Sequence, residues 1–144
     1  MIGVEIDFVV HDCLKALPLY ESIFEVERVE ATSFEAGKNE AVFNMYDTRF
    51  HMLDEVQEMG LLAPKPDMPL SMWVNIMVPD IKSVYEKALK AGCKEVQPVT
   101  EMEAFGVSNA IFCDPMGYIW MLHQIHRIVS FEERCRMFKE MDRK

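Results

Sequence analysis

The sequence contains no apolar run that approaches the ~20 residues needed to cross a membrane. Its first ten residues, MIGVEIDFVV, lack the basic flank and the small-residue cleavage site of a signal peptide, and their alternation indicates a first strand instead. No two cysteines have the C-x-x-C spacing of a zinc ribbon or a redox motif. Because four unpaired thiols suit a reducing compartment, we expect a cytoplasmic protein.

Basic residues are scarce: 15 Lys and Arg stand against 24 Asp and Glu, which gives a formal net charge of −9. A nucleic-acid backbone or an anionic membrane surface would repel such a chain, so we expect neither as a partner. A cationic ligand is compatible with this charge, which solubility alone also explains. With 144 residues, half of them apolar, the chain suits one compact domain with a sizeable core.

What the sequence does contain is a strand–helix–strand–strand–strand order. Residues 5–10 alternate between apolar and polar, and Asp12 stands where a helix N-cap belongs, before an apolar stripe that begins at Cys13. Pro18 interrupts this stripe, so we expect a kink or a late helix start. Further strands are predicted at 27–34, 40–45 and 48–53.

The same order returns after a proline-rich segment. Prolines at positions 64, 66 and 69 cannot continue a helix or a central strand, so a linker is predicted there. A strand at 72–78 and an N-cap at Asp80 follow, before a clean apolar helical stripe. The expected organisation of the single domain 1–144 is module one (3–54), linker (55–71), module two (72–125) and a C-terminal helix (130–142).

The two halves align residue to residue. Glu5–Asp12 matches Trp73–Asp80 at a shift of 68 positions. Arg49–Leu53 matches Tyr118–Leu122 at a shift of 69 positions, which aligns Met52 with Met121. A repeat of two such units predicts a paired-module fold rather than a solenoid, which needs about three or more units.

Two motifs in the second half are distinctive. V-P-D-x-x-x-x-x-x-x-A-x-x-A-G runs from Val78 to Gly92, and F-x-D-P-x-G-Y-x-W runs from Phe112 to Trp120. In this combination the chain resembles the vicinal oxygen chelate superfamily, which includes glyoxalase I, fosfomycin-resistance proteins, extradiol dioxygenases and bleomycin-resistance proteins. Its pattern is most similar to the PhnB-like branch, and the resemblance covers about residues 3–125.

The resemblance implies an α+β fold in which two βαβββ modules form curled mixed sheets around a shared cavity, with the C-terminal helix added. It also implies that each helix covers the outer face of its sheet, so strand alternation predicts which side chains line the cavity. By this reasoning His51 and Trp120 should face the helix side. The predicted ligand-binding residues are Glu5, Asp7, Met52, Asp54, Trp73, Asn75, Met77, Met121 and His123.

Metal-dependent members of the superfamily hold a divalent cation in this cavity, through ligands on the first and closing strands of each module. The corresponding positions here are Glu5, Trp73, Met121 and its aligned partner Met52. Of these four side chains, only the Glu5 carboxylate binds a hard or borderline cation. We therefore expect neither a metal nor another cofactor. Trp73 would offer a stacking surface to a flat or aliphatic ligand, or would simply fill the cavity.

Three functional hypotheses follow. The first is a metal-free, small-molecule-binding protein of the glyoxalase/bleomycin-resistance type that acts as a homodimer. The second is a metal-dependent lyase, isomerase or transferase, in which His123 with Glu5, Asp7 and Asp54 forms a displaced metal site, or acts as a general base oriented by a carboxylate. The third is a dimerisation or interaction module whose cavity has collapsed.

Overall fold

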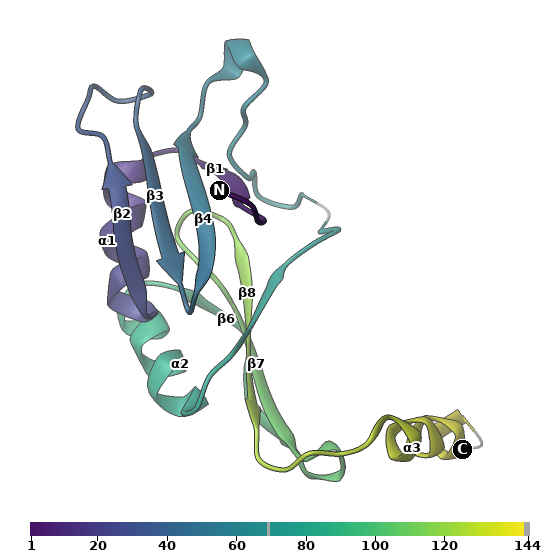
Figure 1. Cartoon of the computed structure of the whole chain (residues 1–144). Helices are drawn as coiled ribbons and strands as arrows, with labels where there is room; N and C mark the ends of the chain where they lie inside the picture. Colours follow the sequence, from purple (N-terminus) through teal and green to yellow (C-terminus); the bar gives the residue numbers. More distant parts are fainter. Residues whose placement is uncertain (69, 143–144) are drawn as a thin grey trace.

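The computed structural model describes residues 1–68 and 70–142 and contains two four-stranded mixed sheets (Figure 1). The strand order is β1–β4–β3–β2 in sheet one and β5–β8–β7–β6 in sheet two. In each sheet the first and last strands of the module pair in parallel, and the other pairs are antiparallel. The α+β fold with two βαβββ modules is therefore confirmed.

Both modules follow the predicted order of elements. Module one contains β1 (Ile6–Val10), α1 (Cys13–Ile23), β2 (Val26–Ala31), β3 (Glu40–Met45) and β4 (Thr48–Asp54). A connecting segment with the short helix η1 (Gln57–Met59) leads to module two, which contains β5 (Val74–Met77), α2 (Ile81–Lys90), β6 (Lys94–Met102), η2 (Glu103–Phe105), β7 (Val107–Cys113) and β8 (Ile119–Ile125). The last helix is α3 (Phe131–Asp142). No helix in the described part of the chain has the length and apolar character to cross a membrane.

Pro18 lies inside α1 without delaying its start. The helix begins at Cys13, and the carboxylate of the N-cap Asp12 accepts the backbone N–H groups of Leu14 and Lys15. The late start expected from Pro18 is therefore wrong. The cap supplies acceptors for the first turn, and a proline farther along removes only one backbone donor from a helix whose buried face is held by the core.

The helix-covered faces of the two sheets share one hydrophobic core with α1 and α2, which lie next to each other (Figure 1). Phe24 of α1 stacks on Phe112 of sheet two with the ring centroids 6.2 Å apart, and Tyr20 meets Trp120 edge-on at 5.5 Å. Because the covered faces are turned toward this common core, the open faces of the two sheets look outward. A cavity shared by both modules is present, and it lies beside the edge strand β1.

Asp114 ties the two modules together inside this core. Its buried carboxylate accepts hydrogen bonds from Tyr20 Oη and from Trp120 Nε1, both at 2.7 Å. It also accepts the backbone N–H groups of Met116 and Tyr118, which shapes the β7–β8 turn. Burial, together with the charge of Asp114, raises the pKa of Tyr20 well above its usual value, so the phenol remains a hydrogen-bond donor.

The closing strands of the two modules correspond at a shift of 70 positions. In module one, β1 pairs with β4 so that Asp7 lies beside His51. In module two, β5 pairs with β8 so that Asn75, the repeat partner of Asp7, lies beside Met121. His51 is therefore the repeat partner of Met121. The alignment that assigned this position to Met52 is wrong by one residue. Since successive side chains of a strand point to opposite faces, a slip of one residue exchanges the two faces.

Two helix caps support the corrected register. Asp54 Oδ1 accepts the backbone N–H of Cys13, the first residue of α1, at 2.7 Å. Gln124 Oε1 accepts the backbone N–H of Ile81, the first residue of α2, at 2.9 Å. The two side chains perform the same task in their modules and are 70 positions apart in the sequence.

We expect Asp114→Ala to lower the free energy of unfolding by about 3 kcal/mol, because the buried Tyr20 hydroxyl and Trp120 indole N–H lose their acceptor. Chemical denaturation followed by tryptophan fluorescence measures the change. Glu86→Ala, at an exposed position of α2, is the control and should change it by less than about 0.5 kcal/mol. A loss below about 1 kcal/mol in Asp114→Ala would contradict the bridging role.

Candidate functional site

The corrected register moves three side chains to the opposite face from the one predicted. Met52 is fully buried in the core, and Asp54 lies against the start of α1, where its Oδ2 also accepts the backbone N–H groups of Gly37 and Asn39. The prediction that Met52 and Asp54 face the cavity is therefore wrong. His51, predicted to face the helix, lies instead on the open face of sheet one, and that prediction is also wrong.

The carboxylate of Asp54 has a structural task. Burial alone would raise its pKa, but the backbone N–H groups of Cys13, Asn39 and Gly37 outweigh burial and hold the pKa below its usual value. The charged form is thus the form that caps α1 and orders the loop before β3. Asp54 is engaged on both of its oxygens and is 3% exposed, so it is not free to contact a ligand.

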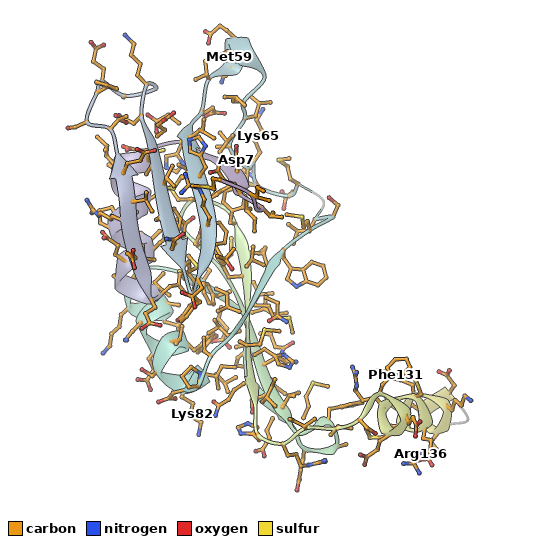
Figure 2. All side chains as sticks on the ribbon, in the orientation of Figure 1. Asp7, Met59, Lys65, Lys82, Phe131 and Arg136 are labelled. Atoms are coloured by element: carbon orange, nitrogen blue, oxygen red, sulfur yellow. The ribbon has the colours of Figure 1, made fainter. Side chains whose placement is uncertain are left out.

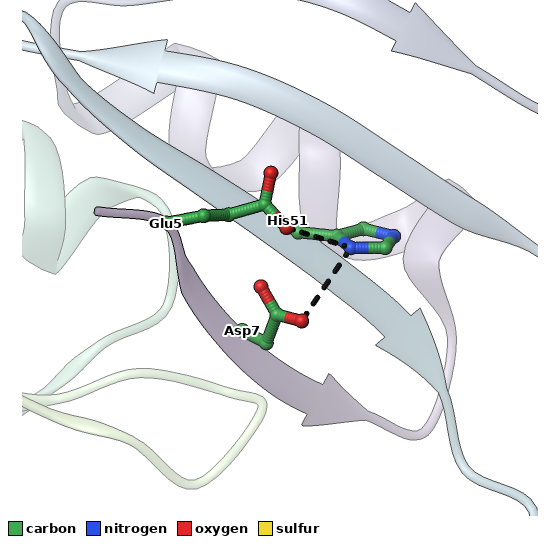
Figure 3. Close-up of side chains that lie close together, drawn as sticks. All are labelled: Glu5, Asp7 and His51. Atoms are coloured by element: carbon green, nitrogen blue, oxygen red, sulfur yellow. Dashed lines mark hydrogen bonds and ion pairs between the residues drawn. The ribbon is translucent and has the colours of Figure 1, made fainter. Parts of the chain in front are cut away.

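Glu5, Asp7 and His51 meet on the open face of sheet one (Figure 3). His51 Nδ1 lies 3.2 Å from Glu5 Oε1 and 3.6 Å from Asp7 Oδ2. The parallel pairing of β1 with β4 sets the two carboxylates beside the imidazole. Glu5 and Asp7 are site residues that the sequence predicts. The sequence alignment of the two modules misses His51, because an error of one residue places its side chain on the helix-covered face.

Two more charged side chains surround this cluster. Arg49 Nε donates a hydrogen bond to Glu5 Oε2 at 2.6 Å, and Glu40 Oε2 lies 3.6 Å from His51 Nε2. His51 Nε2 is buried and has no hydrogen-bond partner among the described residues. Three carboxylates therefore surround one imidazole, while the guanidinium of Arg49 neutralises only one of them.

The two carboxyl groups at the start of the chain have opposite pKa shifts. The hydrogen bond from Arg49 lowers the pKa of Glu5. Burial and the neighbouring Glu5 raise the pKa of Asp7. Glu5 therefore keeps its charge, and Asp7 is the first of the pair to take up a proton as the pH falls. Neighbouring carboxyls with separated pKa values are a frequent feature of functional sites.

The same three side chains are the one group within residues 1–68 and 70–142 with the composition and spacing to hold a metal ion. One ligand atom from each of Glu5, Asp7 and His51 lies within 4.8 Å of the others. Two carboxylates and an imidazole suit divalent cations such as Zn²⁺, Mn²⁺ or Fe²⁺. Arg49 engages Oε2 of Glu5, whereas Oε1 faces Nδ1 of the imidazole at 3.2 Å. The donor set fits a divalent cation.

The remaining predicted residues lie near or on the open face of sheet two. Asn75 and Met77 of β5 are paired with Met121 and His123 of β8, and the exposed fraction of Met77 is 57%. This face mixes apolar side chains with neutral polar ones such as Asn75 and Asn109, in contrast to the acidic open face of sheet one. Because His123 belongs to sheet two and Asp54 to the core, the predicted displaced metal site is not assembled among the described residues of one chain.

A cleft of about 890 Å³ lies where the two modules and the connecting segment meet. Its walls are the edge strand β1, the β7–β8 turn and the connecting segment, and its lining includes Asp7, Val9, Pro64, Trp73, Pro115 and Tyr118. Tyr118 Oη accepts the backbone N–H of Val9 at 3.2 Å and donates to the Val9 carbonyl at 2.7 Å, which holds the turn against β1. The volume is within the range of small-molecule sites, roughly 300–1,000 Å³.

Asp7 and Trp73 are the predicted ligand-binding residues that line this cleft. The exposed fraction of Trp73 is 55%, so a large part of its indole surface is accessible, whereas Trp120 is 3% exposed and belongs to the core as predicted. Asp7 belongs to both the cleft and the Glu5–Asp7–His51 cluster. The polar cluster and the apolar cleft therefore adjoin each other at Asp7, while Glu5 and His51 lie outside the cleft lining.

Comparison with known sequences finds no family model and no curated protein that matches the chain. Comparison with solved structures finds matches over nearly its whole length. Fosfomycin resistance protein FosX from Listeria monocytogenes, complexed with Mn(II) and sulfate ion, has a TM-score of 0.68 and 16% identity over 96% of this chain and 99% of that chain.

Two further structures are similar to the same extent. FosX from Mesorhizobium loti has a TM-score of 0.65 and 18% identity, over 94% of this chain and 99% of that chain. TioX from Micromonospora sp. ML1 has a TM-score of 0.62 and 12% identity, over 90% of this chain and 100% of that chain. The structural neighbours are thus fosfomycin-resistance and related proteins of the vicinal oxygen chelate type, and at these identities the likeness establishes the fold.

Glu5→Gln should lower the pKa of Asp7, because it removes the neighbouring carboxylate that, after burial, raises this pKa. The Asp7 carboxyl of the unaltered protein should hold its proton to a higher pH than in the variant. NMR titration of the side-chain carboxyl carbons follows Asp7 directly. Glu58→Gln, at an exposed position of η1, is the control and should leave the Asp7 titration unchanged. The same Asp7 curve in Glu5→Gln would refute the coupling.

Proposed function

We propose that the protein binds a small organic molecule in the cleft beside β1, and that Asp7, Glu5 and His51 hold the polar end of this ligand. The observation that carries the proposal is the continuity of a cleft of about 890 Å³ with a titratable cluster through Asp7. A cavity with apolar walls and a few convergent polar groups is the usual form of a ligand site. The likeness of the fold to fosfomycin-resistance proteins supports the same class of function.

The ligand that fits this region best is amphipathic, with a cationic or hydrogen-bond-donating group. Arg49 neutralises Glu5, so Asp7 is the carboxylate of the cluster that remains for such a group. An apolar or flat part of the ligand would lie against Trp73 and Pro64.

The kinship with the PhnB-like branch and the cytoplasmic location remain predictions.

We also infer that two copies associate through their open faces. Both open faces look outward, and Met77 on the open face of sheet two is more than half exposed. Large exposed apolar side chains on one face favour burial against a partner. If the open face of sheet two met that of sheet one in a second copy, Asn75, Met121 and His123 would join Asp7 at one site. The predicted ligand contacts of Asn75, Met121 and His123 therefore require this dimer.

A thermal-shift screen with small organic amines, neutral amides and carboxylic acids tests the ligand class. Amines should raise the Tm, since ligand at about 100 times its Kd adds about 2.7 kcal/mol of stability, and carboxylic acids should not. Trp73→Ala and Asp7→Asn should each abolish the shift. Val96→Ala, at an exposed position of β6 outside the cleft, is the control and should keep it. The proposal fails if acids stabilise as well as amines, or if Trp73→Ala retains the full shift.

A metal-dependent enzyme is the second candidate, and the corrected register favours it. His51, rather than Met52, is the repeat partner of Met121. Two of the strand positions that carry metal ligands in metal-dependent members of the superfamily then hold Glu5 and His51, with Asp7 in reach. A divalent cation bound there would act as a Lewis acid toward an oxygen atom of the substrate. In that case Glu5, Asp7 and His51 hold the cation, while Arg49 orients Glu5.

Isothermal titration of Mn²⁺ and Zn²⁺ into the purified chain distinguishes the candidates. If the second candidate is right, the chain should bind about one ion, His51→Ala should weaken binding at least about tenfold through loss of a ligand, and His123→Ala should leave it unchanged. Loss of binding in His123→Ala instead would favour the displaced site. If the unaltered chain gives no heat of binding, the metal-dependent enzyme is excluded and the metal-free binding protein is the remaining candidate.

A further inference from the structure

The apolar face of α3 is largely exposed to solvent. The helix has no buried residue among those described, and the exposed fractions of Phe131, Phe138 and Met141 are 72%, 56% and 58%. Phe138 meets the ring of Phe105 in η2 at 5.6 Å, which anchors the helix near the end of the β7–β8 hairpin, while the rest of α3 stands clear of both sheets (Figure 1). A helix of 12 residues is marginal in water by itself, so burial of this face must contribute to its stability.

Among residues 131–142, one cation interrupts this apolar face. At about 100° per residue, Arg134 projects between Phe138 and Met141, and its guanidinium lies 5.7 Å from the centroid of the Phe131 ring. Arg136 projects from the opposite side of the helix, as Figure 2 shows in relation to Phe131. Aromatic side chains and arginine are the residue types enriched where protein surfaces bury one another. The composition of this face is therefore that of an interface.

The open face of sheet one has complementary charge. Residues 1–54 contain eleven acidic and four basic side chains. On this open face the side chains of Asp7 and Glu40 are 55% and 51% exposed, whereas the cation Arg49 is already paired with Glu5 at 2.6 Å. Leu53 lies directly across the strand pair from Glu40 and is partly buried. The Glu40 carboxylate beside Leu53 is therefore complementary to α3, where the Arg134 guanidinium lies beside aromatic rings.

We propose that α3 of one copy docks on the open face of sheet one in a second copy, with Arg134 paired to Glu40 and the Phe131 and Phe138 rings packed over Leu53. The inference rests on the proposed pairing of open faces and adds to it the element that closes the ligand site. Only five residues separate β8 from α3, so a second copy that meets the open face of sheet two also comes within reach of α3. Within its own chain, α3 points away from sheet one (Figure 1).

Charge reversal across the proposed contact tests it. Sedimentation equilibrium of the full chain should show a dimer whose Kd rises at least about tenfold in Arg134→Glu and in Glu40→Lys, because each leaves like charges face to face. The double variant should recover most of the original affinity. Arg136→Glu changes the same charge on the opposite side of α3 and should leave the Kd within about twofold. Phe131→Asp should weaken the dimer whatever the charge at position 40.

Three other results would each contradict the docking of α3. They also show whether the pairing of open faces fails together with it. If the chain dimerises with the same Kd in Arg134→Glu and Phe131→Asp, the copies pair without α3 and the proposed face pairing survives. If these variants lower the Tm but not the dimer affinity, α3 docks on its own chain. If the unaltered chain is monomeric at 100 times the concentration used in the thermal-shift screen, both the docking and the face pairing are wrong. Ligand binding in the cleft does not depend on this result, because the thermal shift and its loss in Trp73→Ala test it in the single chain.

Discussion

The packing of the two helix-covered faces against each other is the constraint on which the rest of the molecule depends. Aromatic side chains of both sheets and of α1 form this core, and Asp114 joins them by accepting hydrogen bonds from Tyr20 and Trp120. A buried carboxylate is tolerated there because all of its strong acceptor positions face donors. With the covered faces committed to this contact, the open faces must look outward, and the cleft forms where the modules meet the connecting segment.

Much of the fold could be predicted from the sequence because it is encoded locally and twice. Asp12 and Asp80 cap their helices as the patterns indicate, and the strand order is repeated in both halves. The start of α1 could not be predicted from Pro18, because the effect of one proline depends on how strongly the cap and the core hold the helix. Tertiary packing overrides a local preference of this size.

The candidate site could be predicted only in part, because its geometry depends on strand register. Matching Met52 to Met121 rests on identical residues, whereas the structural equivalence rests on Asp54 and Gln124, which differ in type but cap helices in the same way. An alignment that looked for the helix-capping acceptor at the end of each closing strand would have found the shift of 70 positions and turned His51 outward. Residue identity is thus a weaker guide to register than a shared hydrogen-bonding task.

The contact of Tyr118 with Val9 limits how this chain can polymerise. β1 is an edge strand, and the backbone N–H and C=O of Val9 point toward the side where another strand would pair. The Tyr118 hydroxyl occupies both groups, so a foreign strand cannot extend sheet one past this residue without displacing the phenol. Growth of continuous edge-to-edge sheets, which have no fixed number of copies, is therefore blocked at this edge of sheet one.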